Sequence, residues 1–448
     1  MSDEGPATAP GVAEAPPYRA AQATGGAKAP PYMGRVRWGI CALLFCATTI
    51  NYVDRSVLGI LAPTLRTEIG WSDLEYGRIS AAFTLAYAIG FVVAGWFIDR
   101  VGTRIGYAAY LAVWSVAAAA HALAATPIAF GAARFALGLG ESGNFPAAIK
   151  TVAEWFPRRE RALATGLFNA GSNVGVIVAP LVVPWLTLNW SWRVAFAVTG
   201  LIGLVWVLFW LPLYRTPAEH PHLGLEERRH IESDPPEPVI PVSWADMLRH
   251  RQAWAFAVGK FLTDSVWWFY LFWFPLFMAD TFGFDLRNIG LPLVTVYLLA
   301  DVGSVAGGWL SSNLLQRGWT PNAARKTAML TCAILILPVA MAPHVANAWI
   351  AVWLVGLAAA AHQGFSANIF TIASDMFPKG AVGSVVGFGG FAGAMGGFLM
   401  NLGAGWFKEN QGGYGTMFMI AGVAYLIAIA AIHLLAPKLE PARVGVTE

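Results

Sequence analysis

The chain has 448 residues, of which 57% are hydrophobic and only 12% are charged, and its formal net charge at pH 7 is +3. Soluble globular proteins carry about 25% charged residues, so this composition excludes that class. The small net charge also argues against a nucleic-acid partner. The three cysteines, Cys41, Cys46 and Cys332, lie in apolar runs without metal-ligand or redox spacing. The composition therefore predicts a membrane protein.

Apolar segments long enough to cross a bilayer follow one another along most of the chain. They lie near 38–60, 79–98, 105–125, 127–149, 162–185, 192–213, 252–279, 289–312, 326–342, 345–372, 383–405 and 414–436. The sequence thus predicts an all-α membrane protein with twelve transmembrane helices. We expect a disordered tail over 1–34, a first six-helix bundle over 35–213, a cytoplasmic linker over 214–250, a second bundle over 251–437 and a C-terminal tail over 438–448.

Basic residues concentrate in every second loop between these segments. They precede the first segment and follow the second, fourth, sixth and eighth, as with Arg37, Arg104, Arg158, Arg229 and Arg325. The loops between are poor in Lys and Arg. Because cytoplasmic loops carry an excess of basic residues, both termini and the linker are predicted to be cytoplasmic.

The two halves of the chain share a short polar motif. Glu154-Trp-Phe-Pro-Arg158 follows the fourth segment, and Asp375-Met-Phe-Pro-Lys379 follows the tenth. This similarity indicates two related six-helix bundles. Transporters built from such repeats bind substrate and ions at the interface of the repeats, near the bilayer midplane.

The fourth segment carries charges within an otherwise apolar run. Arg134 and Glu141 are seven residues apart, and Asn144 is one turn further. Two helical turns, with about 10 Å of rise, place Arg134 and Glu141 on one face. Charges at such depth usually mark a functional site. The alternative is a structural ion pair that holds two helices together.

The first segment carries a polar stripe. Asn51 and Arg55 lie one turn apart, with Asp54 beside them. The planar fork of Arg55 suits a carboxylate. A rise of about 1.5 Å per residue puts Asp54 and Arg134 at a similar depth, so we expect these two residues to pair. Burial favours a protonated carboxylate and a neighbouring arginine favours an ionised one, so Asp54 and Glu141 can exchange protons.

The loop after the second segment carries the first resemblance to a known family. Gly95-Trp-Phe-Ile-Asp99-Arg100-Val-Gly102-Thr-Arg104 resembles the signature loop of the major facilitator superfamily. We interpret Asp99, Arg100 and Arg104 as gating structure and not as a binding site. The resemblance implies a fold of two pseudo-symmetric six-helix bundles.

Two further motifs narrow the resemblance. Asn51-Tyr-Val-Asp54-Arg55 and Gly140-Glu141-Ser-Gly-Asn144-Phe-Pro146 resemble the anion:cation symporter family, whose members carry organic anions and phosphate. Ala361-His362-Gln363 is similar to the hexuronate transporter branch. The resemblance implies proton-coupled import of glucuronate or galacturonate across a bacterial inner membrane, with Asp54, Glu141 and Arg134 as the proton-coupling residues.

A hexuronate has one carboxylate and several hydroxyls, so its site needs an arginine and a ring of amides and hydroxyls. The candidates are Arg55, Asn51, Tyr87, Asn144, Asn169, Ser172, His362, Gln363, Ser366 and Asn401. For each, a hydrogen bond between helices is an equal alternative. In the seventh segment we expect Lys260 and Asp264 to pair, and Trp267 and Tyr270 to face the sugar.

No nucleotide-binding loop, metal cluster or nucleophile constellation occurs in the sequence, so an enzyme is not predicted. We expect no cofactor, a proton gradient as the energy source, and a monomer whose partners are a small organic anion, protons and the lipid bilayer. The alternatives are a symporter of galactonate, another organic anion or phosphate, a uniporter or exchanger, and a membrane sugar-acid sensor without transport.

Overall fold

The computed structural model describes residues 35–234, 244–377, 379–440 and 442. The expected tail over 1–34, part of the linker and most of the C-terminal tail lie outside these residues. Within the described ranges all regular secondary structure is helical. The expected all-α fold is therefore confirmed.

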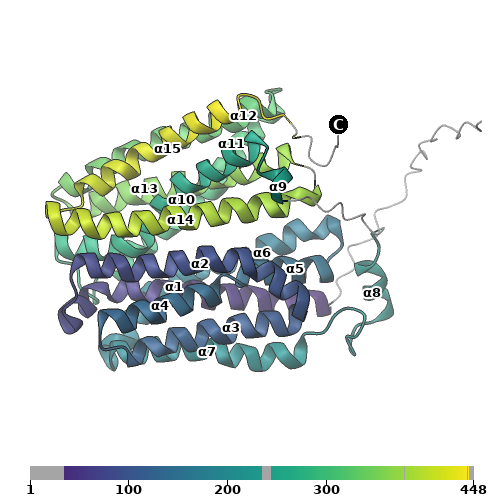
Figure 1. Ribbon diagram of the computed structural model, residues 1–448, viewed down its shortest axis with the longest axis horizontal. Helices are drawn as coiled ribbons and strands as arrows, with labels where there is room; N and C mark the ends of the chain where they lie inside the picture. Colours follow the sequence, from purple (N-terminus) through teal and green to yellow (C-terminus); the bar gives the residue numbers. More distant parts are fainter. Residues whose placement is uncertain (1–34, 235–243, 378, 441, 443–448) are drawn as a thin grey trace, which may run out of the picture. The chain divides into compact units, whose positions relative to one another are not determined.

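The helices fall into two groups joined by the linker (Figure 1). The first group contains α1 (Arg35–Ile69), α2 (Asp73–Val101), α3 (Thr103–Ala120), η1 (His121–Leu123), α4 (Pro127–Glu141), α5 (Asn144–Trp155), α6 (Arg158–Asn189) and α7 (Trp192–Leu213). The linker carries α8 (Leu225–Ile231) and α9 (Trp244–Met247). The second group contains α10 (Arg251–Phe282), α11 (Gly290–Gln316), α12 (Pro321–Ile336), η2 (Leu337–His344), α13 (Ala348–Met376), α14 (Lys379–Gln411) and α15 (Gly415–Leu435).

Local sequence signals explain where several helices begin and end. Ser72 caps α2 in a capping box: Glu75 N donates to Ser72 Oγ at 3.2 Å, and Ser72 N donates to Glu75 Oε2 at 2.8 Å. Thr126 caps α4, whose first residue is Pro127. Gly283 ends α10 in the left-handed conformation, with φ of 70°.

The fourth apolar segment is broken into two helices. α4 ends at Glu141 and α5 begins at Asn144, with a turn at Ser142 and Gly143 between them. Small residues let this segment approach its neighbour closely, since a Cβ added at Gly140 would lie 2.5 Å from Trp114 N of α3. The break puts the Glu141 side chain at the end of a helix inside the bundle.

Ten helices within the described ranges are long and apolar enough to cross a membrane. The other two of the twelve expected segments are not among these ten. The α4–α5 segment consists of two short helices, and α10 contains Lys260 and Asp264 together with several Trp and Tyr residues. Large apolar side chains such as Leu208 (71% exposed) and Val305 (74% exposed) point outward, as they do in proteins that face lipid.

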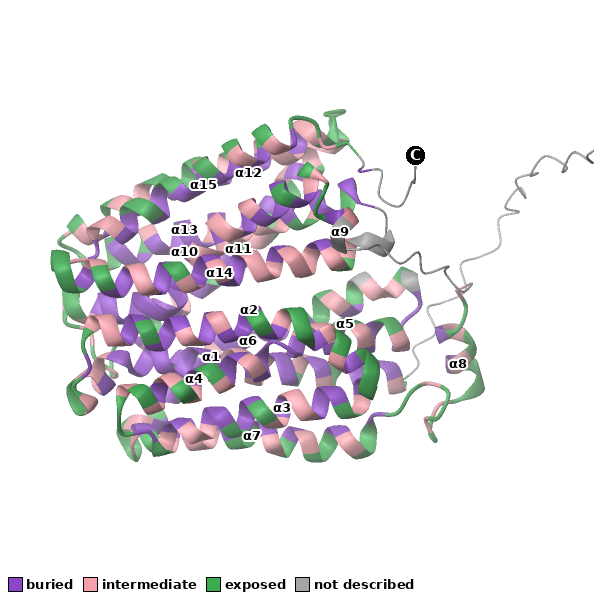
Figure 2. Cartoon of the chain, in the orientation of Figure 1, coloured by how far each residue is buried: buried purple, intermediate pink, exposed green. Residues whose placement is uncertain are grey.

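The two bundles meet along three helix pairs: α2 packs on α14, α1 on α10, and α6 on α11. Buried residues are numerous on α1 and α10 (Figure 2). We call the end of the bundles where α1 begins the linker end, and the opposite end the far end. Glycine permits a close approach towards the far end, where a Cβ added at Gly77 of α2 would lie 2.7 Å from the carbonyl of Asn401 on α14.

Candidate functional site

A buried ion pair lies in the first bundle where it meets the second. Arg55 Nε of α1 lies 2.8 Å from Glu141 Oε2 at the end of α4, and their side chains are 3% and 0% exposed. Arg55 Nη2 also donates to Asn51 Oδ1 at 3.2 Å. Side chains on a helix lean toward its N-terminus, so Arg55 reaches toward the linker end. Because α4 runs toward that end, Glu141 is within its reach.

Aromatic rings surround the Arg55 guanidinium. Its Cζ atom lies 4.6 Å from the ring centroid of Tyr52, 4.9 Å from that of Tyr87 and 5.5 Å from that of Phe83. The fourth ring, at 5.2 Å, is that of Trp268 on α10 in the second bundle. Cations over aromatic faces are stabilised electrostatically, so Arg55 contributes to the contact between the bundles.

Arg134 lies beside this pair and has a different partner from the one expected. Its Nη2 donates to the backbone carbonyl of Arg55 at 3.1 Å. Its Cζ lies 5.0 Å from the Phe83 ring and 5.1 Å from the Phe272 ring of α10. The expected pair between Asp54 and Arg134 does not form in this structure, because the guanidinium binds the carbonyl one residue further along α1.

Asp54 is 1% exposed. The Thr199 hydroxyl of α7 lies near its carboxylate, but neither Asp54 oxygen has a partner at hydrogen-bond geometry among the described residues. An ionised carboxylate in such surroundings is costly unless it is paired.

Asn144, a candidate for substrate binding, forms a hydrogen bond within the first bundle. Its Oδ1 accepts a hydrogen bond from Tyr107 OH of α3 at 2.6 Å. The centroid of the Tyr107 ring lies 5.2 Å from that of Trp206 and 5.1 Å from that of Trp210, both on α7. This bond joins helices inside the first bundle. The sequence pattern could not separate the two roles, since both need a buried amide.

On α6, Asn169 is exposed and Ser172 is 7% exposed. The Ser172 hydroxyl donates to the Asn169 carbonyl at 2.6 Å, within its own helix. Among the described residues neither side chain forms a hydrogen bond with Arg55 or Glu141. The structure therefore does not bring these two expected residues together with the ion pair.

In the second bundle, two expected site residues have partners inside the bundle. His362 Nδ1 lies 2.6 Å from Tyr425 OH. Asn401 Oδ1 accepts from Trp273 Nε1 at 3.0 Å, and its Nδ2 donates to the Gly397 carbonyl at 2.8 Å. Both side chains join helices, which is the alternative weighed for each candidate. Gln363 and Ser366 are partly exposed.

The aromatic residue of α10 that contacts Arg55 is not one of the two that we expected to face the sugar. Trp267 stacks on His362, with ring centroids 4.8 Å apart, and Tyr270 is 3% exposed beside Phe269. Trp268, the next residue along from Trp267, is the one that covers Arg55. The expected Lys260–Asp264 pair does form, with Nζ and Oδ1 2.8 Å apart.

The signature loop lies at the linker end and its charges pair within the first bundle. Lys150 Nζ of α5 lies 2.6 Å from Asp99 Oδ1, and Arg104 Nε donates to the Leu211 carbonyl at 2.9 Å. Arg100 lies over the Trp96 ring at 5.8 Å. Gly102 has φ of 83°, which an L-residue rarely adopts, and it joins α2 to α3.

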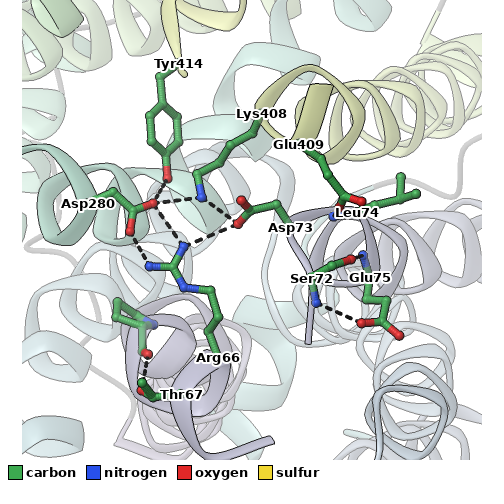
Figure 3. A network of polar contacts seen from close by, with 11 residues as sticks. Arg66, Thr67, Ser72, Asp73, Leu74, Glu75, Asp280, Lys408, Glu409 and Tyr414 are labelled. Carbon is green, nitrogen blue, oxygen red and sulfur yellow. Dashed lines mark hydrogen bonds and ion pairs between the residues drawn. The ribbon is translucent and has the colours of Figure 1, made fainter. Parts of the chain in front are cut away.

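An ionic network that the sequence analysis missed joins the two bundles at the far end (Figure 3). Lys408 Nζ of α14 lies 2.5 Å from Asp73 Oδ1 of α2 and 2.8 Å from Asp280 Oδ2 of α10. Arg66 of α1 pairs with Asp280 and lies 3.4 Å from Asp73. Tyr414 OH donates to Asp280 Oδ2 at 2.7 Å. We call Arg66, Asp73, Asp280, Lys408 and Tyr414 the far-end network.

Comparison with known proteins identifies the family. The model described as Major Facilitator Superfamily matches residues 44–400. The hexuronate transporter of Escherichia coli (strain K12) is 34% identical over 405 residues, covering 89% of this chain and 93% of the relative. The galacturonate transporter of Dickeya chrysanthemi is 35% identical over 309 residues, covering 67% of this chain and 89% of the relative.

A solved structure has the same fold. An inward-facing, occupied bacterial homologue of the human lysosomal transporter Spinster aligns with a TM-score of 0.71 at 19% identity. The alignment covers 90% of this chain and 97% of that one.

Proposed function

The chain belongs to the Major Facilitator Superfamily, and from that premise we propose that it imports a hexuronate, glucuronate or galacturonate, together with protons. It is a sugar-acid transporter and not an enzyme. Import by alternating access uses the energy of the proton gradient and requires no cofactor. The single observation that carries this proposal is the buried pair of Arg55 and Glu141.

The pair links anion binding to proton binding. A substrate carboxylate binds an arginine best through two parallel hydrogen bonds, but Glu141 already occupies the Nε position of Arg55. Protonation of Glu141 removes its charge and frees the guanidinium for the incoming anion. By linkage, the bound anion raises proton affinity and the bound proton raises anion affinity.

Asp54 is the second proposed proton carrier. It is buried beside this pair without a hydrogen-bond partner among the described residues, so the protonated form is favoured while the site is closed. When the bundles move and water reaches the site, water solvates the Asp54 carboxylate. Ionisation then costs less free energy, and the proton leaves. Arg134, whose guanidinium donates to the Arg55 carbonyl, supplies a second positive charge beside these carboxylates.

The far-end network supports alternating access. Asp73 and Arg66 belong to the first bundle, while Asp280 and Lys408 belong to the second, so the network holds the far end closed. At the linker end, Asp99 pairs with Lys150 and Arg325 with Asp375, each within one bundle. The basic loops lie at that end, so we assign it to the cytoplasm and the far end to the outside of a bacterial inner membrane.

The groups around Arg55 suit a sugar acid. Arg55 takes the carboxylate, and Asn51, whose Nδ2 has no hydrogen-bond partner among the described residues, can donate to a hydroxyl. Tyr87 and Trp268 offer aromatic faces to the apolar side of the sugar. The names of the two relatives, a hexuronate and a galacturonate transporter, support the same substrate class.

The test of the substrate is uptake of labelled glucuronate and galacturonate into proteoliposomes of the purified protein. Unlabelled galactonate and phosphate are added as competitors. We expect each hexuronate to block uptake of the other. Competition by galactonate or phosphate alone would contradict the proposed substrate, and ligand binding without flux would indicate a sensor.

A further inference from the structure

Lys260 and Asp264 of α10 form an intramembrane ion pair that the proposed mechanism does not use. Lys260 Nζ and Asp264 Oδ1 lie 2.8 Å apart, and their side chains are 7% and 18% exposed. The Lys260 ammonium also lies 4.4 Å from the centroid of the Phe370 ring of α13. Two charges at this depth are costly and usually mark a functional site.

The pair lies on the face of α10 that meets the first bundle. Lys260, Asp264 and Trp268 are spaced at four residues, so each lies about 40° around the helix from the next and the three follow one side of it. Trp268 covers Arg55, which fixes the direction of that face. Asp264 also interacts electrostatically with Tyr52 of α1, whose ring lies against Arg55. The pair therefore lies beside Arg55, displaced toward the linker end by one to two turns, about 6–12 Å of rise.

Neighbouring helices fix the pair from the other sides. A side chain at Gly393 of α14 would overlap Asp264 Oδ2, so the carboxylate lies directly against the backbone of α14. His362 of α13 lies within electrostatic range of Lys260, and Tyr425 of α15 lies within electrostatic range of Asp264. His362 is in turn held by Tyr425 and by the Trp267 ring. The charges thus have a fixed position relative to the bundle.

The two ends of a sugar acid differ in charge, and this pair is placed to distinguish them. In a hexuronate, one end of the six-carbon chain is a carboxylate and the other is an uncharged aldehyde or its ring form. In an aldarate, both ends are carboxylates. With the first carboxylate on Arg55, the second end extends along the interface by a length comparable with one to two helical turns.

We propose that Lys260 and Asp264 form the subsite for the end of the substrate opposite its carboxylate, and that they select monocarboxylate sugar acids over dicarboxylates. This inference rests on the proposed function. Asp264 cancels the charge of Lys260, so the subsite has no net charge to offer a second carboxylate. The free lone pairs of Asp264 accept hydrogen bonds from hydroxyls and repel an anion.

The proposal makes the charge of the subsite the determinant of selectivity. Asp264→Asn leaves Lys260 without its counter-charge and gives the subsite a net charge of about +1, which favours a dicarboxylate. Lys260→Gln leaves an unpaired carboxylate, which disfavours every sugar acid. The double variant Lys260→Gln/Asp264→Asn is uncharged again, as the native pair is, and should prefer monocarboxylates.

The experiment measures the concentrations of unlabelled glucuronate and glucarate that halve uptake of labelled glucuronate by proteoliposomes. For the native protein, the concentration of glucarate that halves uptake should be at least ten times that of glucuronate. Asp264→Asn should lower this ratio at least tenfold. Lys260→Gln should lose most uptake, and the double variant should recover it with the native ratio. Asp301→Asn on α11 is the matched control and should keep the native ratio.

Several outcomes would overturn the proposal. One is an unchanged ratio in an active Asp264→Asn protein. Another is a double variant that transports no better than Lys260→Gln, which is decisive even when Asp264→Asn does not fold. Active Asp264→Asn and Lys260→Gln proteins that both keep the native ratio, with a lower thermal stability, would assign the pair a structural role only. If the native protein transports no sugar acid, the proposed function itself fails.

Discussion

Arg55 Nε and Glu141 Oε2 lie 2.8 Å apart in side chains that are 3% and 0% exposed, so an incoming carboxylate cannot take the Nε–H of Arg55 unless Glu141 releases it. This relationship makes one arginine the shared partner of an internal carboxylate and an incoming one. A proton on Glu141 decides which carboxylate binds. Coupling therefore requires no long-range signal between separate sites.

Replacement of Arg55 by lysine should weaken substrate binding while the charge is kept. A lysine cannot make two parallel hydrogen bonds to a carboxylate, and a hydrogen bond to a charged group contributes about 1.5–3 kcal/mol, or about tenfold to a hundredfold in affinity. Calorimetry with the purified protein measures the loss. Arg193→Lys, at an exposed position in the same bundle, is the control. Equal affinity in Arg55→Lys and the native protein would remove Arg55 from the site.

Asp54→Asn should abolish accumulation driven by the proton gradient but keep exchange of substrate across the membrane. The amide mimics the protonated carboxylate, which is the form favoured by the burial of Asp54. Gradient-driven uptake and counterflow in the same proteoliposomes separate the two activities. Full accumulation by Asp54→Asn would refute its role as a proton carrier.

Lys408→Gln should open the far end more often. It removes the cation between Asp73 and Asp280 and leaves Arg66 as the one cation of the network beside two carboxylates. Because the pairs are partly exposed, the expected shift between closed and open states is about 1–3 kcal/mol. Spin labels at Thr67 and Asn410, exposed positions on opposite bundles, report the distance after replacement of the native cysteines.

The matched control for this variant is Arg228→Gln, which breaks the exposed pair between Arg228 and Glu232 in the linker. It should leave the distance distribution unchanged. If Lys408→Gln also gives the native distribution, the far-end network does not hold the far end closed.

Tyr107→Phe should lower stability without changing substrate affinity. It removes the hydrogen bond to Asn144 and leaves a buried amide oxygen unpaired, at a cost of about 1–3 kcal/mol. Thermal unfolding in detergent measures the stability, and competition by unlabelled glucuronate measures the affinity. A loss of affinity with unchanged stability would contradict this and assign Asn144 to the substrate site.

The sequence alone was sufficient to predict contacts within one helix and the depth of a residue in the membrane. Four-residue spacing predicted the Lys260–Asp264 pair, because such residues are neighbours on a helix. Counting rise per residue placed Asp54 and Arg134 at one level, and Arg134 does contact the α1 backbone at Arg55. The predicted pair of Asp54 and Arg134 was wrong because rise per residue gives the depth of a Cα atom and not the direction in which its side chain leans. That direction, applied to Arg55 and Glu141, would have suggested their pair.

Contacts between distant helices could not be predicted from a single sequence. Residues 266–278 of α10 are all apolar or aromatic, so their periodicity does not distinguish Trp267 from Trp268 as the residue that covers Arg55. The charged residues of the far-end network lie near the ends of four helices, and Tyr414 precedes a fifth; each one alone is typical of an exposed helix terminus. Only the packing of the two bundles brings Arg66, Asp280 and Lys408 together.

The most direct test of the central claim compares the native protein with Glu141→Gln in proteoliposomes that carry an inward proton gradient. The native protein should accumulate labelled hexuronate, and its affinity should fall as the pH rises. Glu141→Gln should bind and exchange hexuronate with an affinity independent of pH, but should not accumulate it. Gradient-driven accumulation by Glu141→Gln, with the native pH dependence of affinity, would contradict coupling through the Arg55–Glu141 pair.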